Sequence, residues 1–208
     1  MHHILKSHTQ MGESHQSLAF LTLGINFLNL VENIFSETIK QGNAHFIIGD
    51  EFIDEKSYDQ KTKWSDFRIL PPTLFIFYHA LELIMKGLEI LENHEPKPTH
   101  SLNDLYSKIR INEQIPVAIK NIFGKHIDEK FLSSNDIKNF LDTNALSIDD
   151  LYEAFRYPTD KNFNEVYKYL ALKYRGRKLL PYIELIIEDS IQLRRETVSF
   201  YRSRVNEF

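Results

Sequence analysis

A stripe of polar residues on one predicted helix is the first feature of this sequence that could do chemistry. His79, Glu82, Lys86 and Glu89 occur in the segment YHALELIMKGLE, and about 100° of rotation per residue places them on one narrow face. Glu82 and Lys86 stand four residues apart in the order that favours an ion pair. The stripe therefore predicts either a narrow solvent-facing edge with a routine ion pair, or a partly buried cluster that holds an anion or a polar ligand.

Two later segments carry side chains that could join this stripe. His100 stands in Thr-His-Ser-Leu at the start of the next predicted helix, and Arg156 precedes Tyr157 and a proline. A guanidinium offers five N–H donors in a planar fork, which suits a carboxylate or a phosphate. The alternative is structural, with Arg156 paired to Glu82 or Glu89 and each histidine serving in packing. The candidate ligand-binding residues are His79, Glu82, Lys86, His100, Arg156 and Tyr157, and no catalytic role is assigned.

The same side chains make a poor metal site. Two histidines and Glu82 could contact zinc, but they lack H-x-x-x-H spacing on one helix and no further ligand is evident, so no metal is predicted. The chain has no cysteine, which excludes disulfides, thiolate catalysis and cysteine-bound zinc. It also lacks a phosphate-binding glycine loop, G-x-S-x-G and H-E-x-x-H. We therefore expect no cofactor.

Composition favours a soluble protein with an ample core. The 208 residues carry a net charge of −4, which provides no global basic field for nucleic acid. The local exception is the basic run from Arg175 to Lys178, which either contacts phosphates or is simply solvated. The N-terminus lacks the apolar core of a signal peptide, and His79 and Glu82 interrupt the longest apolar run. We expect a cytoplasmic protein without membrane contact.

The elements that must position the stripe are helices. The segment Pro71–Asn93 is apolar on every other side, so it predicts the central helix of a bundle. Further long helices are predicted over Ser17–Lys40 and from Pro181 almost to the C-terminus. Capping or proline signals predict shorter helices that begin near Ser101, Pro116, Ser133, Ser147 and Asn162.

These elements predict an all-α, up-and-down bundle with additional short helices and one long loop. Residues 17–208 form a single domain after a flexible segment, residues 1–16. Residues 43–70 are expected to be a loop or to include a small hairpin that turns at Gly49–Asp50. Long aromatic-rich helices often leave an apolar face uncovered, so we expect a homodimer.

Three motifs in sequence order resemble the HEPN superfamily, above all its bacterial members: YHALELIMKGLEIL, THSLNDL and FRYP. The resemblance covers Leu74 to Pro158. It implies an all-α bundle, commonly dimeric, associated with nucleotide or RNA chemistry and with stress, toxin–antitoxin and phage-defence systems. Catalytic HEPN ribonucleases resemble one another in an arginine followed four to six residues later by a histidine near the C-terminal helix. This sequence has no such pair, because its last histidine is His126.

The resemblance therefore implies a HEPN-like module that binds a nucleotide, RNA or another anionic ligand. One alternative is a non-enzymatic domain with a protein partner, antitoxin-like or part of a complex, in which the polar stripe only fixes helix register. The second alternative is a metal-independent ribonuclease with His79 or His100 as general base and Arg156 stabilising the phosphorane.

Overall fold

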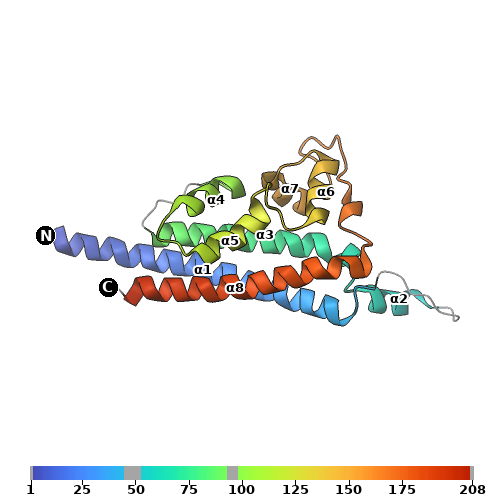
Figure 1. The fold of residues 1–208 in the computed structure, drawn as a ribbon, viewed down its shortest axis with the longest axis horizontal. Helices are drawn as coiled ribbons and strands as arrows, with labels where there is room; N and C mark the ends of the chain where they lie inside the picture. Colours follow the sequence, from blue (N-terminus) through green and yellow to red (C-terminus); the bar gives the residue numbers. More distant parts are fainter. Residues whose placement is uncertain (1, 45–52, 93–97, 207–208) are drawn as a thin grey trace.

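Three long helices lie side by side along the long axis of the molecule (Figure 1). They are α1 (His2–Lys40), α3 (Asp66–Leu91) and α8 (Leu180–Asn206), and α1 runs antiparallel to the other two. The computed structural model describes the backbone of residues 2–44, 53–92 and 98–206, and the side chains of these ranges from residue 15 to residue 205. Over these ranges the chain is helical and contains no strand, so the prediction of an all-α fold is confirmed.

The central helix α3 is enclosed, as its composition predicts. Leu74, Leu81 and Leu88 are fully buried along it, and α1 is the helix that packs most extensively against it. Two glycines allow this close approach. A Cβ at Gly87 would lie 2.6 Å from Leu21 Cδ2, and one at Gly24 would lie 2.7 Å from a side-chain carbon of Ile84. Larger residues at these positions would force the two helices apart.

The last long helix packs mainly against α1 and α5 (Val117–Ile127). α8 contacts these two helices more than it contacts α3. Arg194 of α8 donates to Asn29 and forms an ion pair with Glu32 of α1 at 3.2 Å. α8 therefore joins the layer of long helices mainly through α1, and its contact with α3 is smaller.

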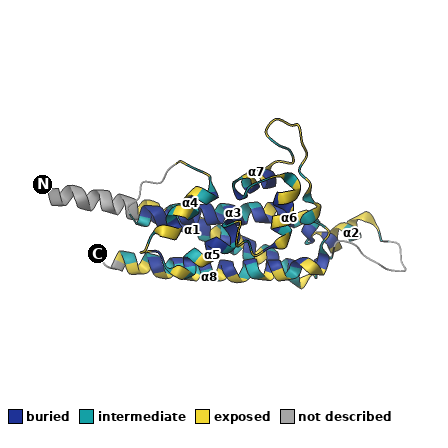
Figure 2. Cartoon of the chain, turned by 45° about the horizontal axis from the view of Figure 1, so that its top comes forward, coloured by how far each residue is buried: buried dark blue, intermediate teal, exposed yellow. Residues whose placement is uncertain are grey.

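Shorter helices cover one side of the long-helix layer (Figure 1), and buried residues concentrate where these two layers meet (Figure 2). Side-chain caps begin two of them: Ser101 accepts from the backbone N–H of Asp104, and Ser134 accepts from that of Ile137. These elements are α4 (Leu102–Ile111), α5, α6 (Asn135–Asn144) and α7 (Leu151–Arg156), with 3-10 turns at η1 (Ile148–Asp150), η2 (Tyr169–Ala171) and η3 (Gly176–Leu179).

The prediction of a loop over residues 43–70 is wrong for most of the residues that the structure describes in this range. Asp54 caps α2 (Glu55–Thr62) by accepting from Ser57 N at 3.0 Å, and α3 begins at Asp66, before the prolines. The eight residues of α2 are mostly polar and carry no apolar stripe, so periodicity could not reveal this helix. The predicted hairpin at Gly49–Asp50 lies outside the described residues.

A buried carboxylate fixes the start of α3. Asp66 accepts the backbone N–H groups of Tyr174, Arg175 and Gly176 at 2.7–2.9 Å. Asn43, which follows α1, accepts from Asp66 N at 2.6 Å and donates to the carbonyl of Gly176 at 2.7 Å. This network joins the end of α1, the start of α3 and the approach to α8.

Two further predicted boundaries need correction. The predicted start at Ser17 is wrong, because helix α1 begins at His2. The helix predicted from Asn162 does not form. Instead, the Asp160 carboxylate accepts backbone N–H groups of the following turn, and an isolated β-bridge joins Thr159 to Val166. A side chain that satisfies the backbone locally competes with helix formation.

Part of α1, His15–Lys40, is long and apolar enough to cross a membrane by length and composition alone. In the structure 28 % of this apolar window is buried: Leu28, Val31 and Phe35 lie in the core, whereas Leu18, Leu23 and Leu30 are exposed. The core of a helical bundle requires the same composition.

Candidate functional site

The polar stripe of α3 centres on one buried carboxylate. Glu82 is 1 % exposed. Its Oε1 accepts a hydrogen bond from Lys86 Nζ at 2.7 Å and lies 2.9 Å from His100 Nδ1. Its Oε2 lies 3.6 Å from His79 Nδ1 and accepts no hydrogen bond of good geometry. Four of the predicted candidate residues therefore come together around Glu82.

Local structure explains how His100 reaches α3. The residue stands just before the capped start of α4, and Asp149 of η1 holds that start from the other side. Asp149 accepts from Ser101 Oγ at 2.9 Å and from the backbone N–H of Asn103 at 3.0 Å. Because a carboxylate can only accept, His100 Nδ1 must carry the proton in its contact with Glu82.

The partners of Glu82 keep it ionised in spite of its burial. Burial alone would raise the pKa of Glu82, but the close approach of His79, the hydrogen bond and charge of Lys86, and the contact with His100 lower this pKa to about 2. The site is thus a buried anion that holds one lysine and two histidines in place.

Tyr152 is a site residue that the sequence did not single out. Its hydroxyl is hydrogen-bonded to His79 Nδ1 at 3.1 Å, and the ring of His100 stacks against it with centroids 6.3 Å apart. Burial raises the pKa of Tyr152; Glu82 raises it further and Arg156 lowers it. The sequence feature that could have identified Tyr152 is its spacing from Arg156. The two residues stand four positions apart and therefore share one face of a helix.

Arg156 and Tyr157 lie beside this cluster and not within it. Both are exposed, and the guanidinium lies 5.1 Å from the ring centroid of its neighbour Tyr157. Within the described ranges Arg156 makes no ion pair, so the predicted pairing with Glu82 or Glu89 is wrong. Both glutamates already have lysine partners, and Arg156 acts on the cluster only through its charge near Tyr152.

The rest of the stripe is enclosed as well. Glu89 is buried and lies 2.8 Å from Lys108 Nζ of α4; this contact is electrostatic, because neither oxygen of Glu89 accepts a hydrogen bond of good geometry. The predicted alternative of a narrow solvent-facing edge is therefore wrong. The stripe faces the short helices, which the sequence could not place against it.

The cluster opens to solvent on its histidine side. The side chain of His79 is 27 % exposed and that of His100 is 75 % exposed, whereas Glu82 and most of Lys86 lie beneath them. Two imidazoles, the Tyr152 phenol and the nearby guanidinium of Arg156 are donors or cations. This arrangement can accept an anion at the surface above a buried carboxylate. Among the described residues, no three His, Asp or Glu side chains come together as metal ligands.

A second polar cluster was also missed. Asp189 of α8 accepts from Lys125 Nζ at 2.7 Å and lies 2.9 Å from Nε2 of the buried His126 on α5. Burial would raise the pKa of Asp189, but hydrogen bonds from His126 and Lys125 lower it. The partners are distant in sequence, and their ion pairs join α5 to α8 inside the protein.

Comparison with known proteins gives one match. A family model described as the HEPN domain matches residues 67–193, which is more than half of the chain and includes α3, the short helices and the start of α8. No curated protein and no solved structure matches. The matched region contains every residue of the Glu82 cluster, and the chain belongs to the HEPN family.

Proposed function

We propose that the protein binds a phosphate-bearing ligand, a nucleotide or RNA, against the exposed side of the Glu82 cluster. One observation carries the proposal: a fully buried carboxylate orients His79 and His100 toward the surface next to Tyr152. Membership of the HEPN family, with its nucleotide- and RNA-related modules, supports this class of ligand.

The chemistry of the cluster favours an anion over a cation. Lys86 already neutralises Glu82, so a protonated histidine gives the site a net positive charge. Arg156 is exposed without an ion pair among the described residues, so its guanidinium can take two phosphate oxygens at once. Tyr152 and Tyr157 add aromatic faces on which a base can stack.

Fluorescence anisotropy with a labelled 5′-phosphorylated single-stranded RNA tests the proposal, with the unphosphorylated RNA and free nucleotides as competitors. We expect Arg156→Ala and His100→Gln each to weaken binding by about tenfold, the loss of one charge-assisted hydrogen bond. Arg202→Ala is the matched control, because Arg202 is also exposed but lies on α8. If all three variants bind like the wild type, the cluster is not the binding site.

A ribonuclease is the second candidate, and the tautomer of His100 favours it. Because Nδ1 donates to Glu82, Nε2 of the neutral ring bears the lone pair that a general base needs. Arg156 would then stabilise charge on the phosphorane. Incubation with end-labelled RNA, with and without a chelator, tests this function. Cleavage that persists in chelator and is lost in His100→Gln would support it; intact RNA after prolonged incubation would leave only binding.

We further propose that the protein is a homodimer through α1. Leu23 and Leu30 are exposed two turns apart on this helix, and Leu18 is exposed on the turn before them. Sedimentation equilibrium should show a dimer that Leu23→Glu with Leu30→Glu dissociates. The matched control is Ile111→Glu, at an exposed apolar position of α4. A monomeric wild type at high concentration would refute the proposal.

A further inference from the structure

A cleft of about 560 Å³ opens between α4 and the loop that follows α5, and we call it the α4 cleft. One wall is α4, from Asn103 to Arg110, and the other is the loop from Asp128 to Phe131. Sites for small molecules have volumes of about 300–1,000 Å³. None of the lining residues takes part in the hydrogen bonds and ion pairs described for Glu82, so the cleft is a second candidate site.

The loop wall is held in place by its own hydrogen bonds and by a contact with η1. Asp128 accepts the backbone N–H of Lys130 at 3.1 Å through its side chain and that of Phe131 at 2.8 Å through its carbonyl. Glu129 accepts the backbone N–H of Ile148 at 2.8 Å. The loop therefore keeps its shape without a ligand, and a molecule that binds here meets a preformed surface.

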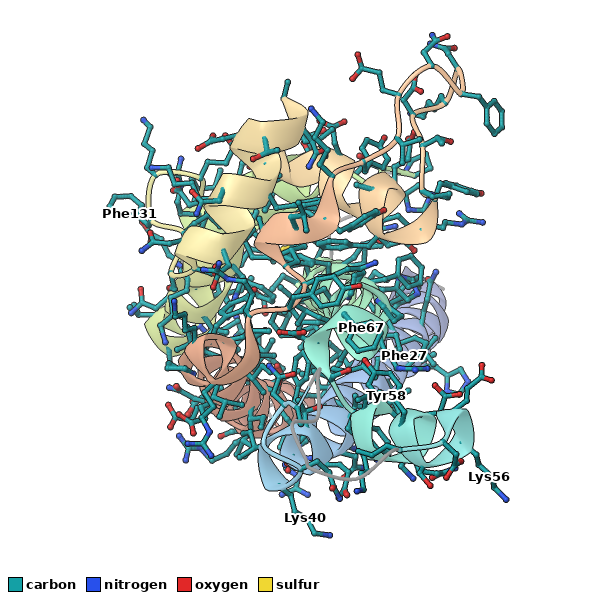
Figure 3. The ribbon with its side chains drawn as sticks, turned by 90° about the vertical axis from the view of Figure 1, so that its right-hand side faces the viewer. Phe27, Lys40, Lys56, Tyr58, Phe67 and Phe131 are labelled. Atoms are coloured by element: carbon teal, nitrogen blue, oxygen red, sulfur yellow. The ribbon has the colours of Figure 1, made fainter. Side chains whose placement is uncertain are left out.

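Two aromatic rings line the α4 cleft. Tyr106 is partly buried, and its hydroxyl lies 2.7 Å from the point where a Cβ on Gly124 would stand, so the ring takes space that a larger residue on α5 would fill. Burial raises the pKa of Tyr106, which keeps the phenol neutral. Phe131 is 71 % exposed and lies at the outer edge of the molecule (Figure 3). These rings offer faces against which a planar ligand stacks.

Two cations border one end of the cleft. The side chain of Arg110 is 60 % exposed, and its Nη1 lies 3.9 Å from Asp128 Oδ2, which is too far for a hydrogen bond. Lys130 is exposed and forms no ion pair with any described residue. Both residues adjoin Asp128, and the donors of both side chains remain available for a phosphate.

The other end of the cleft presents hydrogen-bond acceptors. Asp149 accepts from Asn103 Nδ2 at 3.3 Å, which leaves the carbonyl oxygen of the amide, Oδ1, as a free acceptor. The Asp104 carboxylate makes no hydrogen bond or ion pair with any described residue. Asp104 lies in the first turn of α4 and Arg110 in the last, about 9 Å apart at a rise of about 1.5 Å per residue. Acceptors and cations therefore occupy opposite ends.

The lining selects against simple ions. Arg110 and Lys130 are balanced by Asp104 and Asp128, so the cleft has no net charge to hold a small anion. The two carboxylates lie toward opposite ends, and no three His, Asp or Glu side chains of the described residues come together as metal ligands. A ligand that fits carries an anion at one end, hydrogen-bond donors at the other and a flat ring between them.

A nucleotide has this layout, and the acceptors indicate its base. In adenine and cytosine the amino group stands beside an acceptor nitrogen, and in uracil a single N–H stands between two carbonyls. Of the four common RNA bases, guanine alone presents two adjacent donors, the N1–H and the N2 amino group. These donors match the two acceptors of the cleft, Asn103 Oδ1 and the Asp104 carboxylate.

We propose that the α4 cleft binds a guanine nucleotide. The base lies along Tyr106 and Phe131 with its donor edge toward Asp104, and Arg110 and Lys130 bind the phosphate. This site is separate from the Glu82 cluster, and neither proposal depends on the other.

Calorimetric titration of the full chain with guanosine 5′-monophosphate tests this site, with adenosine 5′-monophosphate, guanosine and inorganic phosphate as comparison ligands. Arg110→Ala removes a phosphate contact, and Asp104→Asn changes an acceptor that reads the base. Their matched controls are Arg202→Ala on α8 and Asp142→Asn on α6, because both positions are exposed and lie outside the cleft.

We expect guanosine 5′-monophosphate to bind at least about tenfold more tightly than each comparison ligand. Arg110→Ala should weaken this binding by about tenfold and leave the binding of guanosine unchanged, whereas Asp104→Asn should abolish the preference for the guanine nucleotide over the adenine nucleotide. Both controls, and His100→Gln at the Glu82 cluster, should bind the guanine nucleotide like the wild type.

Absence of binding by every ligand, or full binding by Arg110→Ala, overturns the proposal. Equal binding of inorganic phosphate would show a simple anion site instead, and equal binding of the adenine nucleotide would overturn the guanine assignment. Loss of nucleotide binding in His100→Gln, with Arg110→Ala unaffected, would place the nucleotide at the Glu82 cluster. The binding of 5′-phosphorylated RNA by the Glu82-cluster variants is measured separately, so each proposal can fail without the other.

Discussion

Replacing Glu82 by glutamine tests whether the buried carboxylate of the candidate site is ionised. The lowered pKa of Glu82 sets the expected size of the effect on stability. The carboxylate has a pKa lowered from 4.5 to about 2 by its partners. A depressed pKa contributes stability that is fully present above the unfolded-state value and is lost as pH falls through the folded-state value. Glu82 therefore stabilises the fold near neutral pH and progressively loses that effect between about pH 5 and pH 2.

The magnitude follows from the shift. Each pKa unit corresponds to about 1.4 kcal/mol, so the shift of Glu82 is worth about 3 kcal/mol in full and about 2 kcal/mol between pH 5 and pH 3. Glutamine does not titrate and cannot neutralise Lys86, so Glu82→Gln should be less stable than the wild type at pH 5.

Urea denaturation of both proteins at pH 5 and pH 3 measures this effect. We expect the stability difference between wild type and Glu82→Gln to shrink by about 2 kcal/mol at the lower pH, because the wild type then loses the contribution that the variant never had. Other carboxylates titrate equally in both proteins and cancel. A difference that does not change with pH would refute the assignment of Glu82 as a buried, ionised group.

Three further outcomes are expected. Asp66→Ala should lower the free energy of unfolding, measured by urea titration, by about 3 kcal/mol, because it leaves buried backbone N–H groups without an acceptor. The control Asp54→Ala, at an exposed helix cap, should cost about 1 kcal/mol. Equal losses in the two variants would contradict the network described for Asp66. Gly87→Ala should destabilise by about 1–3 kcal/mol, because its Cβ would lie 2.6 Å from Leu21; an unchanged melting temperature would contradict the close helix approach. Arg156→Ala should leave stability within about 0.5 kcal/mol, and a larger loss would reveal a structural partner for the arginine.

The sequence predicted the features that depend on local pattern. The apolar surface of the segment from Pro71 requires an enclosed helix, and the Glu82–Lys86 pair follows from helical spacing alone. Ser101 and Ser134 accept from backbone N–H groups in the capping geometry that begins α4 and α6. The starts of these helices were predicted to within a few residues, because a capping serine lies within one turn of the backbone N–H group that it accepts.

Features that depend on distant residues escaped prediction. Nothing in the spacing of Asp189 and His126 indicates that they meet, and the same holds for Asp66 and the backbone of Gly176. The structure also leaves Arg156 outside the Glu82 cluster, because Lys86 and the two histidines already contact the Glu82 carboxylate. Helical pattern defines which face of α3 is polar, but tertiary packing decides what covers that face.

The ring signals of the histidines offer the most direct test of the proposed binding site. Nuclear magnetic resonance spectra of the selectively labelled imidazoles, recorded during titration with a 5′-phosphorylated oligonucleotide, should show His79 and His100 shifting together along one saturable curve. His126, equally bound to a carboxylate but buried between α5 and α8, should not move. Saturable binding that leaves His79 and His100 unshifted, or that shifts His126 as strongly, would contradict a ligand seated above Glu82.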